Sequence, residues 1–145
     1  MDDSFDLTRF DLSRFVEAQS TVYHEVLAEL RAGRKRSHWM WFIFPQLKGL
    51  GRSSASEYYG IGSLDESRAY LRHPVLGPRL EECTLLVNRV DGRTADEIFG
   101  FPDNLKFRSS MTLFARVAEK RSVFQVAIEK YFDGEADAQT AALLS

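Results

Sequence analysis

Residues 34–54 read RKRSHWMWFIFPQLKGLGRSS, and the middle of this stretch is the longest apolar run in the chain. Two tryptophans and two phenylalanines fall between positions 39 and 44, and a run that is apolar on all sides is typical of a protein interior. The run is six residues long, whereas a membrane span requires roughly 20. The stretch therefore predicts the centre of a hydrophobic core. It is too short for its periodicity to distinguish a buried strand from a short helix.

The sequence on both sides of this run has the spacing of amphipathic helices. Apolar residues recur three and four positions apart over 15–30, where 19–21 are predicted to interrupt the helix and Gly33 to end it. Further apolar stripes of helical spacing run over 76–90, 107–118 and 124–131. Strand-type alternation is nearly absent. We therefore predict a mainly α protein, folded as a compact single-domain multi-helix bundle with short connecting loops.

Two pairs of residues have the spacing of helix capping boxes. Ser63 is followed three positions later by Glu66, and Thr94 in the same way by Glu97. In a capping box the hydroxyl accepts from the third backbone N–H, and the carboxylate accepts from the backbone of the cap residue. Helices are therefore predicted to begin just after Ser63 and Thr94. A further helix is predicted from Leu105, capped by one of the two residues before it.

Length, composition and charge indicate one ordinary globular domain over 1–145. The 145 residues are 44% hydrophobic and 28% charged, and the ends at 1–6 and 134–138 are predicted to be flexible. The net charge of -2 argues against a dedicated nucleic-acid binder, because such proteins carry a basic surface. The acidic N-terminus lacks the basic start and apolar centre of a signal peptide, and no apolar run is long enough to span a membrane. We expect a cytoplasmic protein.

Cysteine and histidine are too few to predict a metal centre or a disulfide. Cys83 is the single cysteine and falls on an apolar stripe, so it is interpreted as a small core residue. The three histidines lack the spacing to acidic residues that is typical of metal ligands. We therefore expect no metal, and the sequence leaves any cofactor open.

The polar residues around the aromatic run form the first candidate site. His38 adjoins the run, and histidine is the side chain most often used as a general acid or base near neutral pH. Gly51 permits close approach of a backbone to a ligand, and Arg52 can bind a phosphate through two hydrogen bonds. The same residues are equally consistent with a turn that follows the core, and the basic run before His38 with a solvated helix end.

A second polar cluster lies in PDNLKFRSSMTLF, residues 102–114. On a helix, Lys106 shares a face with Ser109 and Ser110, which are three and four positions later. A lysine beside a serine can lower the proton affinity of the hydroxyl and make it a nucleophile. Packing near the start of a helix explains two serines as well, and both interpretations stay open.

Five strings of the sequence together resemble one protein family. They are DLSRFVEAQ, ELRAGRKRSHWMWFIFPQLKGLGRS, YGIGSLDESRAYLRHPVLGPRLEEC, EIFGFPDNLK and RSSMTLFA. They resemble, in order, the blocks of bacterial domain-of-unknown-function family 1810. The resemblance implies a compact, mainly α-helical, single-domain cytosolic protein with no established reaction. The polar members of these blocks are Gln19, Gly33, Lys35, His38, Gln46, Gly51, Arg79, Lys106, Ser109 and Ser110.

Two functions are compatible with these residues. The first is a pocket for a phosphorylated or nucleotide-like small molecule, and the similar layout of the NADAR family, which shares no motif residue by residue, points to ADP-ribose or NAD chemistry. Its catalytic residues would be His38 and Lys106. Its ligand-binding residues would be Lys35, Trp39, Trp41, Gln46, Gly51, Arg52, Arg79, Ser109 and Ser110. The alternative is a non-catalytic protein-protein interaction module with an exposed apolar patch, which would involve Tyr58 and Tyr59. Whether the protein is an enzyme stays open.

Overall fold

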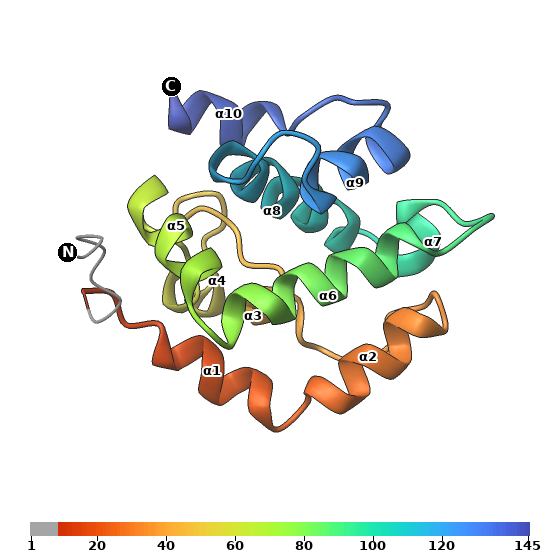
Figure 1. Ribbon diagram of the computed structural model, residues 1–145, viewed down its shortest axis with the longest axis horizontal. Helices are drawn as coiled ribbons and strands as arrows, with labels where there is room; N and C mark the ends of the chain where they lie inside the picture. The colour runs from red at the N-terminus through yellow and green to blue at the C-terminus, as the bar shows by residue number, and fades with distance from the viewer. Residues whose placement is uncertain (1–8) are drawn as a thin grey trace.

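The structure is a computed structural model that describes residues 9–145, which form ten helices (Figure 1). The prediction of a mainly α protein is confirmed. Over the described residues there is no β-strand, only one isolated parallel bridge between Leu47 and Ile61. The helices are α1 (Ser13–Ser20), α2 (Tyr23–Arg31), α3 (Met40–Ile43), α4 (Ser54–Tyr58), α5 (Leu64–Arg72), α6 (Leu76–Asn88), α7 (Ala95–Phe99), α8 (Asp103–Val117), α9 (Val123–Phe132) and α10 (Ala138–Leu144).

Two helices, α6 and α8, hold the others together. α6 crosses the middle of the view in Figure 1, with α1 and α2 on one side and α8, α9 and α10 on the other. It packs against α2, α5 and α9, while α8 packs against α5, α7, α9 and α10. No described helix has the length and apolar character that crossing a membrane requires.

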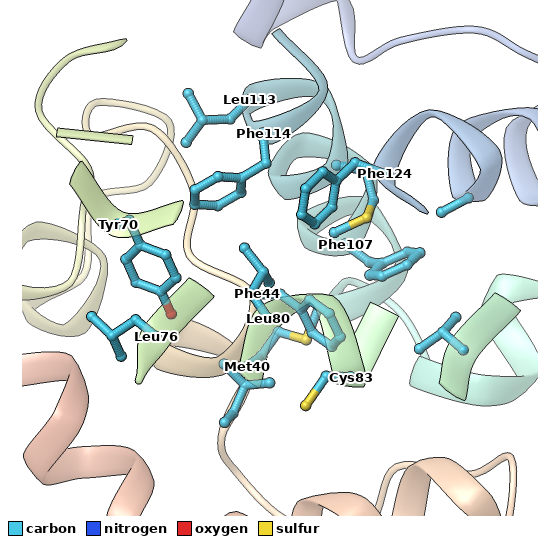
Figure 2. Packing of buried hydrophobic residues seen from close by; sticks show 14 of the residues in the cluster. Met40, Phe44, Tyr70, Leu76, Leu80, Cys83, Phe107, Leu113, Phe114 and Phe124 are labelled. Carbon is cyan, nitrogen blue, oxygen red and sulfur yellow. The ribbon is translucent and has the colours of Figure 1, made fainter. Parts of the chain in front are cut away.

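The aromatic run forms the centre of the core, as its composition predicts. Trp39, Met40, Ile43 and Phe44 are buried, and the run includes the one-turn helix α3, which answers the question of helix or strand. The ring centroid of Phe44 lies 5.0 Å from that of Phe107 with the planes at 87°, an edge-to-face contact. Figure 2 shows this packing among buried side chains of α3, α6 and α8.

The predicted helix boundaries and caps agree with the structure except for one capping bond, at Glu66, and one helix start, that of α8. α1 ends at Ser20 and α2 begins at Tyr23, which confirms the predicted interruption. The Thr94 capping box is complete, but Glu66 accepts from the backbone of Gly62 and not from that of Ser63. The other carboxylate oxygen of Glu66 lies 3.0 Å from Arg14, and this long-range ion pair sets the direction of the side chain.

The second difference concerns α8, which begins at Asp103, two positions before the predicted start at Leu105. Pro102 occupies the cap position and makes no side-chain capping bond. Of the two segments predicted to be flexible, residues 1–6 lie outside the described residues. Residues 133–137 connect α9 to α10, and Ala138 is the first residue of α10, so the predicted segment 134–138 is mostly loop. Its flexibility stays a prediction.

Candidate functional site

The two polar blocks of the sequence meet at one cleft, which we call the α8 cleft. Its volume is about 230 Å³, and it lies between α3, the loop 46–51, the first half of α8 and the start of α10. Five predicted site residues line it together: Trp41, Gln46, Gly51, Lys106 and Ser109. The other lining residues are Leu50, Pro102, Leu105, Asp137 and Gln139.

Lys106 is the cation of the α8 cleft, and two neighbours hold its ammonium group. The Nζ atom lies 3.7 Å from the ring centroid of Trp41 and 3.3 Å from Oδ1 of Asp103. An ammonium group over an indole face is attracted by the negative face of the ring. The head group of Lys106 is therefore placed at the cleft by contacts within the protein.

Lys35 shares the carboxylate of Asp103 with Lys106. Its Nζ lies 2.8 Å from Oδ2 of Asp103 and donates to the carbonyl of Ser37 at 2.6 Å. Only 7% of its side chain is exposed. Two lysines around one aspartate leave one positive charge uncompensated, and because Lys35 is buried, Lys106 presents that charge to the cleft.

Trp39, which was predicted to stack a ligand ring, is buried and takes part in a partly buried hydrogen-bond network around Glu29. Its indole Nε1 donates to Oε1 of Glu29 at 2.9 Å, and the backbone N–H groups of Arg36 and Ser37 donate to the same oxygen. The hydroxyl of Ser37 donates to the other oxygen at 2.5 Å. Burial alone raises the pKa of Glu29, but hydrogen bonds from Ser37, Arg36 and Trp39 outweigh it and lower the pKa to about 2. Trp39 therefore fixes the loop before α3.

The remaining polar groups of the cleft differ in how much of their hydrogen-bonding capacity is free. Asp137 caps α10 by accepting from the backbone and hydroxyl of Thr140, and Ser109 donates to the Leu105 carbonyl at 3.1 Å. The side chain of Gln46 makes no hydrogen bond to any described residue. The indole N–H of Trp41 and the amide of Gln139 likewise make no hydrogen bond to a described residue, so these two groups, Lys106 and the amide of Gln46 have donors left for a ligand.

Gly51 has a packing role at the edge of the cleft. A Cβ atom at this position would lie 2.9 Å from the Cβ and Oγ atoms of Ser56. Glycine therefore allows the loop 46–51 to pass close to α4. This contact accounts for the residue without a bound phosphate.

Comparison with known proteins places the chain in a family. A family model described as a protein of unknown function, DUF1810, matches residues 9–144. The chain belongs to the DUF1810 family. The solved structure of the conserved hypothetical protein Rv1873 from Mycobacterium tuberculosis is 60% identical, with a TM-score of 0.92 over 93% of this chain and 96% of that one. No curated protein matches this DUF1810 chain.

Six predicted site residues of this DUF1810 chain do not line the α8 cleft: Lys35 and Trp39, described above, Ser110, and three that are exposed or lie in another cluster. His38 and Arg52 are exposed and make no hydrogen bond or ion pair with any described residue. Arg79 lies in a separate cluster, where its guanidinium group stacks 4.7 Å from the ring centroid of Tyr23 and approaches Gln19 at 3.4 Å. The functional roles of these three residues stay predictions.

Ser110 and Cys83 are buried in the core and line neither the α8 cleft nor the larger hollows of the surface. Ser110 is fully buried, and its hydroxyl has no hydrogen-bond partner among the described residues. Cys83 is also buried, and burial raises the pKa of its thiol to about 12, so the thiol stays protonated. The interpretation of Cys83 as a core residue is confirmed.

Sequence reasoning missed the residues that complete the cleft. Asp103 was considered only as a helix cap, although its spacing of three from Lys106 is a signal for an ion pair on one helix face. Asp137 and Gln139 reach the cleft from α10 through tertiary packing against α8, which no local pattern reports.

Larger hollows on the surface contain none of the predicted site residues. One of about 520 Å³ has Asp65 and Arg68 among its lining residues, and these two form an ion pair at 2.9 Å. Another of about 790 Å³ is lined by residues 9–13 together with Val16, Glu17 and His73. The α8 cleft is therefore the candidate site on the basis of its chemistry and not its size.

Proposed function

We propose that the α8 cleft binds a small molecule that carries an anionic group on a compact apolar or aromatic body. The observation that carries the proposal is the ammonium group of Lys106. It is held at the cleft over the ring of Trp41, and its only carboxylate partner among the described residues is shared with Lys35. An anion that enters the cleft would complete this arrangement of charges. Apolar surface from Leu50, Pro102 and Leu105 would contact the rest of the ligand.

The size of the cleft narrows the ligand class. Its volume of about 230 Å³ is smaller than the roughly 300–1,000 Å³ of sites that enclose drug-sized ligands. A phosphate monoester or a carboxylate with one ring fits this volume better than a complete NAD or ADP-ribose molecule. We therefore favour a small phosphorylated or carboxylated compound, or one end of a larger nucleotide-like ligand.

Each polar residue of the cleft has a distinct role in this proposal. Lys106 provides the charge, and because Asp103 and Trp41 already position it, little side-chain entropy is lost on binding. The free amide of Gln46, which also lines the cleft, would donate a directional hydrogen bond to the ligand. If the ligand is transformed, Lys106 is the group placed to stabilise a developing negative charge.

Calorimetric titration with phenyl phosphate tests the proposal, with benzyl alcohol as the neutral probe. We expect phenyl phosphate alone to bind, and Lys106→Met to weaken its binding by at least about tenfold, since a lost charge-assisted hydrogen bond contributes roughly 1.5–3 kcal/mol. The matched control is Lys120→Met, because Lys120 is exposed and outside the cleft. Equal binding by the wild type and both variants would contradict the proposal.

A partner-binding function is a second candidate, favoured by exposed apolar residues near the mouth of the cleft. Phe101 is 77% exposed and Leu105 44% exposed, on either side of the lining residue Pro102. A candidate partner should lose affinity for Phe101→Ser and keep it for Leu143→Ser, an equally apolar change at an exposed position on α10. Loss of affinity in both variants would indicate non-specific apolar contact.

A further inference from the structure

A second concave region lies where α2 and α6 end, and we call it the arginine hollow. The two helices pack against each other, and both end on the right of the view in Figure 1. The hollow has a volume of about 350 Å³ and shares no lining residue with the α8 cleft. Three of its lining residues are arginines that come from different parts of the sequence: Arg31, Arg89 and Arg93.

These three arginines have no partner within the described part of the chain. None of their guanidinium groups makes a hydrogen bond or an ion pair there. Asp91 is the one acidic residue among the described lining residues, and its carboxylate lies 3.5 Å from Nζ of Lys130. The hollow therefore carries an excess of positive charge, although the whole chain has a net charge of -2.

The ends of the helices explain only part of this cluster. Arg31 is in the last turn of α2 and Arg89 follows α6 directly, where cations interact favourably with the helix dipole. Arg93 is in the loop after α6, beyond the reach of that effect. Its presence in the hollow follows from the packing of this loop against the end of α2.

Gly33 makes that packing possible. Its φ angle of +74° is one that glycine adopts at little cost, and a Cβ atom there would lie 3.2 Å from Val90 and 3.4 Å from Cδ of Arg93. The glycine thus lets the loop after α6 sit against the end of α2. As a result, Arg31 and Arg93 line the same hollow although they lie far apart in the sequence.

We infer that the arginine hollow is a binding site for a small anion with several phosphate groups. The planar guanidinium group can donate two parallel hydrogen bonds to a phosphate, and three such groups around one concavity suit a ligand with more than one. A volume of about 350 Å³ is within the usual range for small-molecule sites. The concave shape favours a small anion over a nucleic-acid duplex, which requires a basic stripe along the surface.

Calorimetric titration with inorganic tripolyphosphate tests this site. The titration is done at about 0.15 M ionic strength, because charges more than about 8 Å apart are then largely screened and only nearby cations hold the ligand. The test variant is the triple substitution Arg31→Gln, Arg89→Gln and Arg93→Gln. The matched control is Arg52→Gln, Arg116→Gln and Lys120→Gln, which removes the same charge from exposed residues outside the hollow. We expect the test variant to bind at least about thirtyfold more weakly than the wild type and the control to bind within about threefold of it, because charge-assisted pairs are lost only in the former.

Three results would overturn the assignment. The first is an equal loss of affinity in both triple variants. The second is no binding by the wild type at millimolar tripolyphosphate. The third is a wild type that binds a single-stranded oligonucleotide but does not bind tripolyphosphate. Lys106→Met distinguishes this site from the α8 cleft, because it should leave tripolyphosphate binding unchanged while it weakens that of phenyl phosphate. Circular dichroism of both triple variants confirms that they are folded, which is expected because none of the replaced side chains is buried.

Discussion

The α8 cleft and the arginine hollow both present cations, but these cations are held in different ways. Lys106 rests on the ring of Trp41 and pairs with an aspartate that also binds a buried lysine. The arginines of the hollow have no such partners among the described residues. A cation fixed by its neighbours is positioned before a ligand arrives, and its network contributes to folding. A cation without neighbours contributes little to folding, so only a binding measurement reveals its role.

The largest effect that this comparison predicts is at Asp103. Asp103→Asn leaves the ammonium group of Lys35, with 7% of its side chain exposed, without a counter-charge. We expect the free energy of unfolding to fall by about 3 kcal/mol, because removal of one partner from a buried ion pair typically costs 3–5 kcal/mol. Urea denaturation at pH 7 measures this change.

The control for Asp103 is an aspartate in an exposed pair. Asp65 lies 2.9 Å from Arg68, and about half of each side chain is exposed, so Asp65→Asn should cost less than about 1 kcal/mol. Similar losses at the two positions would show that the network beneath the α8 cleft contributes no more than a surface pair.

An intermediate effect is expected at Glu29, whose network fixes the segment that connects the two regions. Glu29→Gln should lower the free energy of unfolding at pH 7 by about 2 kcal/mol, since a hydrogen bond to a charged acceptor contributes roughly 1.5–3 kcal/mol. Because the pKa of the folded carboxyl is about 2 and its ordinary value is 4.5, this contribution is complete above pH 4.5. It is lost as the pH falls towards 2.

Urea denaturation of the wild type and Glu29→Gln across this pH range measures the contribution directly. The difference in stability between the two proteins should be constant between pH 5 and 7 and should shrink as the pH falls from about 4.5 to about 2. A difference that stays the same across the range would mean that the charge of Glu29 does not stabilise the fold.

The smallest effect is expected in the arginine hollow. Replacement of Arg31, Arg89 and Arg93 by glutamine should change the free energy of unfolding by about 1 kcal/mol in total, because only Arg31 and Arg89 adjoin helix ends and each such exposed cation contributes roughly 0.3–1 kcal/mol at low salt. Thermal unfolding in buffer without phosphate measures this change. A loss of several kcal/mol would mean that the arginines are structural, which would contradict the contrast with Lys106.

Particular residues show how far the sequence could predict this molecule. Whether a segment is helical depends largely on its own residues. The apolar stripes therefore fall on helices as their periodicity predicts, and Ser63 and Thr94 cap helices as their capping chemistry predicts. Two tryptophans stand two positions apart in the same aromatic run, but their surroundings differ. Trp39 is buried and donates to Glu29, whereas Trp41 lines the α8 cleft. Trp39 precedes the short helix α3 and Trp41 lies on it, and the direction of each side chain depends on tertiary packing.

The composition of the two sites depends on contacts between distant segments. Lys35 was predicted to bind a ligand and Lys106 to be catalytic. Both pair with Asp103, but Lys35 is buried there and Lys106 lines the cleft. The arginine hollow could not be predicted because the basic run that includes Arg31 appeared isolated. Only the packing of the loop after α6 brings Arg93 beside it.

The most direct test of the central claim uses the two tryptophans as reporters of the α8 cleft. Phenyl phosphate would be titrated into nitrogen-labelled protein while the two indole N–H signals are followed by nuclear magnetic resonance, and Trp41→Phe would assign them. We expect the signal of Trp41 to shift to saturation, the signal of Trp39 to stay in place, and Lys106→Met to abolish the shift. Equal shifts of both signals, no shift at millimolar phenyl phosphate, or an unchanged titration in Lys106→Met would contradict it.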